Sequence, residues 1–267
     1  MHRIEPFRLR LCREAIRFFR SGGLPGVRVL HLSDFHLSAT VPLRHIRRAV
    51  HLGLQARPTL ACITGDFVTG ELPQRREYGA VLRELSQCVP TYACLGNHDG
   101  GRWAGHHGAA ETTTAMTAFL ADAGIVCLFN ASRVIRAAGQ ELCLVGLGDL
   151  WAGDADPATA FQSVPSDRLP VLVLCHNPDA KDLLRPYRWD LMLCGHTHGG
   201  QLRLPLLGTP FAPVRDQRYV AGLHGWSGRM LYVTAGVGSL HGLRLNCPPE
   251  VAVLDLVGAE AAAATGP

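Results

Sequence analysis

The sequence predicts an α/β fold with a substantially parallel or mixed sheet, and three observations support this prediction. Short apolar runs recur at fairly even spacing along the 267 residues. Most of these runs are continuously apolar and do not alternate with polar residues, which is typical of strands covered on both faces. Segments with a helical pattern lie between several of the runs, and strand–helix–strand order favours parallel pairing.

Each element can be placed on the chain in order. The predicted strands have the length and apolar content of buried strands, and they span residues 27–33, 59–64, 91–95, 141–147, 170–175, 191–194, 230–236 and 250–256. Two segments between them, LRHIRRAVHLGLQA (43–56) and the stretch around YGAVLRELSQC (78–88), are predicted to be helices. No internal repeat or Ser/Pro-rich linker interrupts this order.

Length and composition bound the domain organisation. With 47% hydrophobic and 18% charged residues, the chain can bury a large core in one domain or at most two. We predict a main domain over residues 27–257, preceded by a basic segment (1–26) and followed by a frayed tail (258–267). No apolar stretch is long enough for a membrane span, and early arginines interrupt any signal peptide, so a cytoplasmic location is expected.

The N-terminal segment is predicted to contain a basic amphipathic helix over residues 10–20. On a helical wheel one side carries the arginines, Arg10, Arg13, Arg17 and Arg20, and the other carries Leu11, Ala15, Ile16, Phe18 and Phe19. Two interpretations stay open. The arginines contact an anionic membrane on its cytoplasmic face, or the helix packs on the domain with its arginines in solvent.

Cysteine placement and net charge narrow the function classes. Nine cysteines are present, and several lie inside apolar runs such as LACIT and LVLCH, where a thiol behaves as a small buried hydrophobe. The count is odd and no C-x-x-C pair occurs, so reduced thiols are expected. A net charge of +4 predicts no nucleic-acid binding.

Five polar fragments follow predicted strands. They are SDFH (33–36), TGDF (64–67), GNHD (96–99), CHNPD (175–179) and CGHTHGGQ (194–201). Open α/β sheets bind ligands at the carboxyl ends of their strands. Any one of these fragments is a weak indication, because a lone histidine at a strand end is more often structural. Their succession, each after its own strand, predicts a shared site.

The residue types in these fragments suit phosphoester cleavage by two metal ions. Two cations about 3.5–4 Å apart neutralise the phosphate and lower the pKa of a shared water. The mixture of carboxylate, imidazole and amide donors suits Mn, Fe or Zn better than an all-oxygen magnesium site. A metallopeptidase would need H-E-x-x-H, which the sequence lacks.

The five fragments resemble the motifs of the calcineurin-like metallophosphoesterase superfamily, D-x-H, G-D, G-N-H-D/E, H and G-H-x-H, over about residues 27–256. The resemblance implies a four-layer sandwich of two mixed sheets packed face to face and flanked by helices. It also implies two divalent ions, with manganese expected and iron or zinc as alternatives. Asp34, His36 and His198 would bind one ion, Asn97, His176 and His196 the other, and Asp66 would bridge them.

The same resemblance assigns roles around the metals. His98 would face the substrate as the acid that protonates the leaving group while a metal-bridging hydroxide attacks, and Asn97 would lie near the substrate. Asp99 would orient His98 and favour its charged form, or else cap the following helix. Two roles stay open for Arg244: it forks onto a substrate phosphate, or it braces its own glycine-rich loop.

Two further stretches indicate one branch of this superfamily. VGLGDLWAG (145–153) and GVGSLHGLRLNCPPEV (236–251) resemble a small bacterial branch of phosphodiesterases and pyrophosphatases at the cytoplasmic face of the membrane. The expected function is therefore hydrolysis of a phosphodiester or pyrophosphate, with a phosphodiester or nucleotide-lipid substrate. UDP-diacylglucosamine pyrophosphohydrolysis in lipid A synthesis is the specific alternative, and a non-catalytic metal-binding scaffold is the remote one. The oligomeric state is left open.

Overall fold

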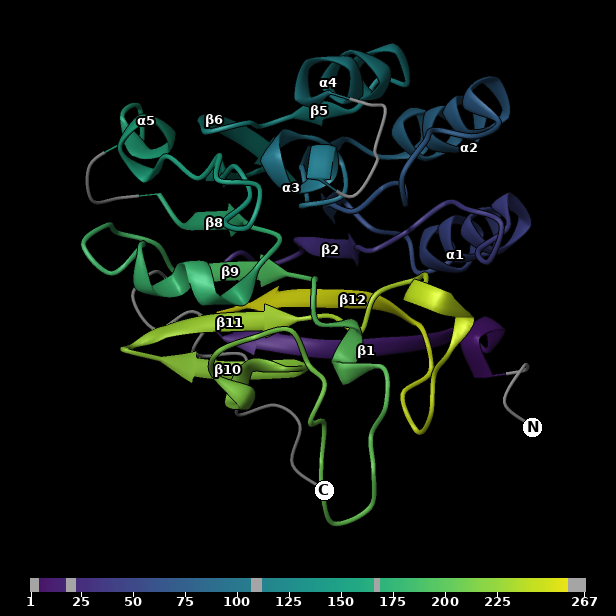
Figure 1. The fold of residues 1–267 in the computed structure, drawn as a ribbon. Coiled ribbons are helices and arrows are strands. Elements are labelled where there is room, and N and C mark those ends of the chain that lie inside the picture. The colour runs from purple at the N-terminus through teal and green to yellow at the C-terminus, as the bar shows by residue number, and fades with distance from the viewer. Residues whose placement is uncertain (1–4, 18–22, 107–111, 166–168, 259–267) are drawn as a thin grey trace.

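The computed structural model describes residues 5–17, 23–106, 112–165 and 169–258, which form two mixed six-stranded sheets with flanking helices (Figure 1). The first sheet has, in spatial order, β1 (Arg10–Arg17), β12 (Glu250–Val257), β2 (Arg28–Leu32), β3 (Leu60–Thr64), β4 (Thr91–Cys94) and β5 (Val126–Cys127). Strands β2 to β5 are parallel, and β12 runs antiparallel to β2 but parallel to β1.

The second sheet has the order β10 (Gly222–Trp226), β11 (Arg229–Val233), β9 (Leu191–Cys194), β8 (Val171–Leu174), β7 (Gln140–Gly146) and β6 (Ala131–Ala137). Its four central strands are parallel, and the edge strands β10 and β6 are each antiparallel to their neighbour. The α/β class predicted from the sequence is confirmed.

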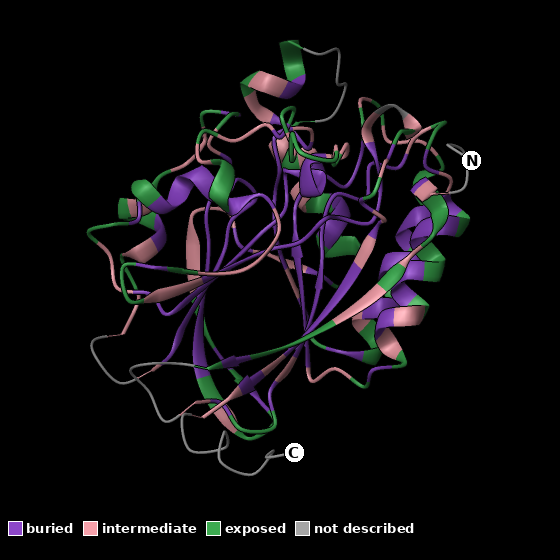
Figure 2. Cartoon of the chain, turned by 90° about the horizontal axis from the view of Figure 1, so that it is seen from below, coloured by how far each residue is buried: buried purple, intermediate pink, exposed green. Residues whose placement is uncertain are grey.

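Three apolar clusters separate the layers. One contains residues from both sheets, among them Val29 of β2 and Leu172 of β8, and so lies between them. The next residue of each strand belongs to an outer cluster: Leu30 packs with α1 (Leu43–Leu54), α2 (Arg75–Cys88) and α4 (Thr113–Asp122). Val173 packs with α5 (Pro157–Phe161) and Trp189. Because successive strand residues point to opposite faces, both faces are buried, as Figure 2 shows along the strands.

All eight predicted strands and both helices predicted between them are present. The strands that the sequence did not indicate, β1, β5, β6 and β10, are the four edges of the two sheets. An edge strand has one neighbour only and does not need the continuous apolar run by which the central strands were recognised. The short helix α3 (Gly101–His106), α4 and α5 were also missed.

The predicted N-terminal helix is wrong for the described residues 10–17, which form β1. This strand pairs in parallel with β12 over its whole length, from Arg10 with Glu250 to Arg17 with Val257. Pairing with a strand at the other end of the chain overrides the local helical spacing. Of its eight residues only Ile16 is buried, and the exposed arginines protect the open edge from pairing with other chains.

Because β1 lies within the expected basic segment (1–26), part of that segment belongs to the first sheet. Residues 1–4 and 18–22, and residues 259–267 of the expected tail, lie outside the described residues. None of the described helices is long and apolar enough to cross a membrane.

A buried histidine between the sheets gives stability a pH dependence. His31 of β2 is fully buried, and its Nε2 lies 2.9 Å from the Thr64 hydroxyl. Burial lowers the pKa of His31 from 6.5 to about 3. Between these two pH values only the unfolded chain takes up the proton, so stability is fully present above pH 6.5 and is lost as pH falls.

We therefore expect His31 to contribute a loss of about 1.4 kcal/mol of unfolding free energy per pH unit below its unfolded pKa. Chemical denaturation of wild type and of His31→Asn, at several pH values from about 4 to about 8, measures this slope. The variant should have the shallower slope, whatever its stability at neutral pH. Parallel pH profiles in the two proteins would contradict the assignment.

Candidate metal centre

The predicted ligands come together where the carboxyl ends of the two sheets meet. Residues 33–36, 65–67 and 95–99 follow β2, β3 and β4, and residues 175–177 and 195–198 follow β8 and β9. Hydrogen bonds join these loops across the sheets: His176 Nδ1 donates to the Thr64 carbonyl at 2.6 Å, and the His196 amide donates to the Asp34 carboxylate at 3.1 Å. Distant parts of the sequence thus form one buried cluster.

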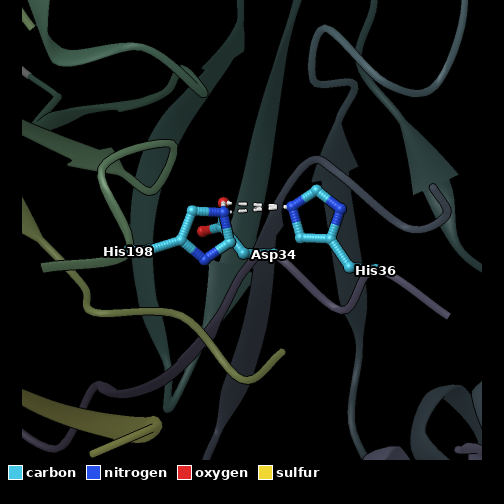
Figure 3. A group of neighbouring side chains, drawn as sticks. All are labelled: Asp34, His36 and His198. Atoms are coloured by element: carbon cyan, nitrogen blue, oxygen red, sulfur yellow. Dashed lines mark hydrogen bonds and ion pairs between the residues drawn. The ribbon is translucent and has the colours of Figure 1, made fainter. Parts of the chain in front are cut away.

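Asp34, His36 and His198 form the first group of donors (Figure 3). The Asp34 Oδ1 atom lies 3.4 Å from His198 Nε2 and 3.9 Å from His36 Nε2. The two imidazole Nε2 atoms are 3.1 Å apart. All three side chains are buried. One carboxylate oxygen and two imidazole nitrogens therefore converge on a volume the size of an ion.

Asn97, His176 and His196 supply the second group. The Asn97 Oδ1, His176 Nε2 and His196 Nε2 atoms are all buried and make no hydrogen bond. The two imidazole rings lie edge to face with their centroids 5.0 Å apart. Buried polar atoms are nearly always hydrogen-bonded, so unpartnered donors of these types fit a site that a cation completes.

The Asp66 carboxylate lies between the two groups. Its Oδ2 atom is 3.2 Å from His36 Nε2 of the first group and 3.1 Å from His176 Nε2 of the second. Its other oxygen, Oδ1, accepts a hydrogen bond from the His98 amide at 3.0 Å. Asp66 therefore offers one free oxygen to both sets of donors at once.

Hydrogen bonds on the far side of two rings orient them toward the cluster. His176 Nδ1 is held by the Thr64 carbonyl, and His36 Nδ1 lies 2.7 Å from the Thr69 hydroxyl. Because a carbonyl only accepts, His176 carries a proton on Nδ1, and its Nε2 points toward Asp66. Such partners are what fixes the tautomer of metal-binding histidines.

The local backbone is strained at most of these positions. Five predicted ligands have left-handed backbone, with φ of 55° at Asp34, 47° at His36, 56° at Asp66, 68° at His196 and 50° at His198. Left-handed conformation is uncommon outside glycine, and it costs about 1–3 kcal/mol per residue. The surrounding hydrogen bonds maintain it, and it turns consecutive side chains of each short loop inward.

Two glycines permit the close approach of these loops. A Cβ at Gly96 would collide with the Asp66 carboxylate, and a Cβ at Gly195 would collide with the Ser33 hydroxyl and the Asp34 carboxylate. Side chains at either position would displace the acidic groups from the cluster. This explains why G-N-H-D and G-H-x-H both begin with glycine in this chain.

Burial and mutual charge set the protonation of the cluster. Burial lowers the pKa of His196 to about 3, helped by the neighbouring His176, and it also lowers the pKa of His198. For His176 burial acts in the same direction, but the Asp66 carboxylate outweighs it and raises the pKa. The neutral imidazoles of His196 and His198 are in the form that binds metal.

His98 lies beside the cluster without being enclosed by it. It is only half-buried, whereas the predicted ligands are all buried. Its ring lies edge to face with that of His36 at a centroid distance of 5.0 Å, and one of its ring nitrogens falls within the His36–Asp66 group. This position gives His98 access to both the donor cluster and solvent.

Asp99 has a different environment from the one expected. Its carboxylate accepts hydrogen bonds from the backbone amides of Asp66 (2.7 Å), Phe67 (2.7 Å) and Gly96 (2.9 Å). Burial and the charge of Asp66 raise the pKa of Asp99 to about 7. The expected pairing with His98 is not among these contacts, and neither is a cap on the following helix. Asp99 instead joins the loops after β3 and β4.

The contacts of Arg244 favour one of its two open roles. Its side chain has no exposed surface, and its guanidinium donates to the carbonyls of Ala235, Gly238, His198 and Cys247. These carbonyls take up its donors and no substrate phosphate can reach it. The loop-bracing alternative is the one that the geometry supports, and the brace includes the backbone of His198. Asn97 is also buried.

Sequence reasoning missed two residues at the site. Asp149 is buried, with Oδ1 accepting from the amides of Trp151 and Ala152 and Oδ2 unpartnered. The partly exposed Trp151 ring lies edge to face with His196 at 4.4 Å between centroids. Both follow the predicted strand 141–147 directly, so the strand-end rule used for the five fragments would have found them.

The arrangement fits divalent metal ions. Six buried donors of three chemical types surround the shared Asp66 carboxylate, and three of their atoms, Asn97 Oδ1, His176 Nε2 and His196 Nε2, make no hydrogen bond. Carboxylate with imidazole is a donor set for transition metals. The residues present therefore fit the metal centre that the motifs implied, without specifying which metal it holds.

Comparison with known proteins agrees with this geometry. The family model for calcineurin-like phosphoesterases matches residues 27–200. The chain is 48% identical over 258 residues to the Escherichia coli protein called phosphodiesterase YaeI, covering 96% of this chain and 92% of that one. It is 27% identical over 278 residues to UDP-2,3-diacylglucosamine pyrophosphatase LpxG of Chlamydia trachomatis, covering 86% and 84%. The chain belongs to the calcineurin-like phosphoesterase family and is a metal-dependent phosphoesterase.

Arg244 gives a test that separates bracing from substrate binding. Arg244→Ala would leave several buried carbonyls without a donor, so we expect a loss of about 3 kcal/mol or more in unfolding free energy. Denaturant titration measures it, with exposed Arg48→Ala as the matched control, expected within about 0.5 kcal/mol of wild type. A stably folded Arg244→Ala with a raised KM would restore the substrate-binding interpretation.

Proposed function

We propose that this phosphoesterase hydrolyses phosphodiester or pyrophosphate bonds with two divalent metal ions. The observation that carries the proposal is the position of Asp66 Oδ2, about equally far from His36 Nε2 at 3.2 Å and His176 Nε2 at 3.1 Å. A carboxylate oxygen shared by two donor groups is the arrangement that a two-ion site needs. Manganese is the metal we propose first, with iron and zinc as alternatives.

The ligand assignment follows the two donor groups. We assign Asp34, His36 and His198 to one ion, Asn97, His176 and His196 to the other, and Asp66 to both. When bound, such ions neutralise the phosphate and lower the pKa of a coordinated water. The chain's own contribution is to hold these donors rigidly, by burial and by the hydrogen bonds that His176 and His36 form with Thr64 and Thr69.

His98 is proposed as the acid that delivers a proton to the leaving oxygen. It is the half-buried residue among the clustered histidines, so it can meet a substrate that the enclosed ligands reach only through the metals. A hydrogen bond from its backbone amide to Asp66 Oδ1 fixes its backbone relative to that carboxylate. Histidine is the side chain that most often transfers protons in such reactions.

A diester or pyrophosphate is favoured over other phosphoesters by the similarity to phosphodiesterase YaeI and, more distantly, to LpxG. The substrate class proposed is therefore a phosphodiester, with a nucleotide lipid such as UDP-diacylglucosamine as the specific candidate. Nine free thiols support the proposed cytoplasmic location, since reduced cysteines are typical of that compartment.

Substitution of His98 should separate catalysis from metal binding. His98→Ala should lower kcat by about 10²–10⁴-fold while the metal content stays at the wild-type level. His196→Ala should lose metal occupancy as well as activity, because its Nε2 is an assigned ligand. Elemental analysis and steady-state kinetics measure both, with the exposed His51→Ala as control. Equal metal loss in the first two variants would show that His98 is itself a ligand.

The substrate class is tested with the manganese-loaded protein on two compounds, bis-p-nitrophenyl phosphate and UDP-diacylglucosamine. Hydrolysis of both, with UMP released from the lipid, is the expected result if the nucleotide lipid is the substrate. Hydrolysis of the synthetic diester alone would keep the diesterase assignment and exclude the lipid nucleotide. A metal-loaded protein inactive on both, and inactive on p-nitrophenyl phosphate, would contradict the proposal.

A further inference from the structure

Exposed apolar side chains gather in one loop of the molecule. Residues 203–212, here called the hairpin loop, contain Leu206, Leu207 and Phe211, whose exposed fractions are 106%, 71% and 68%. Figure 1 shows this loop extending below β10 and β1, away from both sheets. Large hydrophobic residues are rarely this exposed together unless the surface has a binding partner.

The tip of the hairpin loop is an ordered turn. Leu204 and Gly208 exchange two backbone hydrogen bonds, of 2.7 and 3.0 Å, around Pro205, Leu206 and Leu207. Leu206 has a left-handed φ of 67°, a conformation that favours glycine or asparagine in turns. A leucine held in that conformation and fully exposed gains nothing from the fold, which indicates that its side chain acts outside the chain.

Two segments joined to the hairpin loop by hydrogen bonds carry further exposed apolar side chains. Leu245 and Asn246 hydrogen-bond to Gln201 and Arg203 at the base of the hairpin loop, and exposed Leu243 lies just before them. The Cys247 amide donates to Glu5 of η1 (Glu5–Phe7), which carries the exposed Phe7. Of the eight large hydrophobic side chains exposed in the described residues, five therefore belong to three connected segments.

Basic side chains flank these segments. Arg203 and Arg215 lie on either side of the hairpin loop, and Arg8 follows Phe7; all three are exposed. Among the described residues none of the three forms an ion pair, whereas the nearby Arg218 pairs with Asp216. Unpaired arginines beside exposed apolar residues match an anionic surface with an apolar interior.

We propose that the hairpin loop, with Leu243 and Phe7, docks the protein onto an anionic lipid bilayer. The leucines would enter the acyl region and the arginines would contact the headgroups. A protruding turn suits a fluid medium that closes around it, while a stable protein interface buries about 800 Å² per partner on complementary surfaces. Docking concerns where the enzyme works, which the proposed function does not specify. It does not depend on which diester is the substrate.

Docking would also place the metal centre beside the lipid surface. The hairpin loop begins shortly after His198, and Gly200 between them packs against Thr209 of the loop. The Arg244 brace ties the His198 carbonyl to Cys247, whose amide contacts η1. The segments that would touch the bilayer are therefore joined directly to the ligand loop.

The experiment is co-sedimentation of the full, manganese-loaded chain with vesicles. Vesicles of phosphatidylglycerol and phosphatidylethanolamine should bind the wild type, and vesicles of pure phosphatidylcholine should bind it several-fold less. The double variant Leu206→Ser/Leu207→Ser should reduce partitioning about tenfold or more, since each buried leucine contributes strongly to transfer. Leu183→Ser, at an exposed leucine outside these segments, is the matched control and should bind like wild type.

Hydrolysis of bis-p-nitrophenyl phosphate is measured on the same preparations. It should be unchanged in the double variant and in Leu183→Ser, because none of the three substituted residues belongs to the donor cluster. Vesicle binding that is equal in wild type and the double variant would overturn the proposal. So would a wild type that binds no vesicle but forms a dimer that the double variant abolishes, since the surface would then join two copies. Either result leaves the proposed hydrolytic function standing.

A second measurement locates the contact. Phe211→Trp places a fluorophore in the hairpin loop, and lipids brominated on their acyl chains should quench its emission more than that of wild type, whose four tryptophans lie elsewhere. Emission that brominated anionic vesicles do not quench beyond the wild-type level would show that the loop stays outside the acyl region.

Discussion

The Asp66 carboxylate is the group on which the rest of the site depends. It is buried among three histidines, and its Oδ2 lies within 3.2 Å of two of them, His36 and His176. A charge in this position is tolerable only because a backbone amide and three imidazoles surround it. The His98 amide holds one oxygen, and Asp99 in turn holds the Asp66 amide. Displacing Asp66 would therefore disturb both donor groups and the loop that carries His98.

The fold compensates for the strain that this cluster imposes. Five of the proposed ligand residues have left-handed backbone, and unpartnered polar atoms are buried around them. Both features oppose folding in the absence of a bound ion. They persist because two extensively buried sheets set the positions of the loop ends, and because residues such as Arg244 and Asp99 saturate the loop carbonyls and amides. The rigid part of the molecule thus stabilises its strained edge.

The same bracing connects the metal centre to the surface. The loop that supplies His196 and His198 continues into residues 203–212, and Arg244 joins the His198 carbonyl to the segment before β12. β12 in turn separates β1 from β2 in the first sheet. The pairing of β1 with β12 and the hydrogen bond from Cys247 to Glu5 therefore join segments that are far apart in the sequence to the loop that carries His196 and His198.

The sequence by itself determined the class of fold, the central strands and most of the residues that cluster at the predicted metal centre. Continuous apolar runs reveal strands that are buried on both faces, and polar residues directly after them reveal the site, because both patterns are local. The edge strands could not be recognised from a local pattern. β1 has arginines at helical spacing, and only its pairing with β12, far away in the sequence, makes it a strand. The roles of Arg244 and Asp99 were decided in the same way, by which backbone groups the tertiary structure brings to them. Burial turned Arg244, a side chain suited to binding phosphate, into a brace, because a guanidinium removed from water must give its donors to whatever carbonyls surround it.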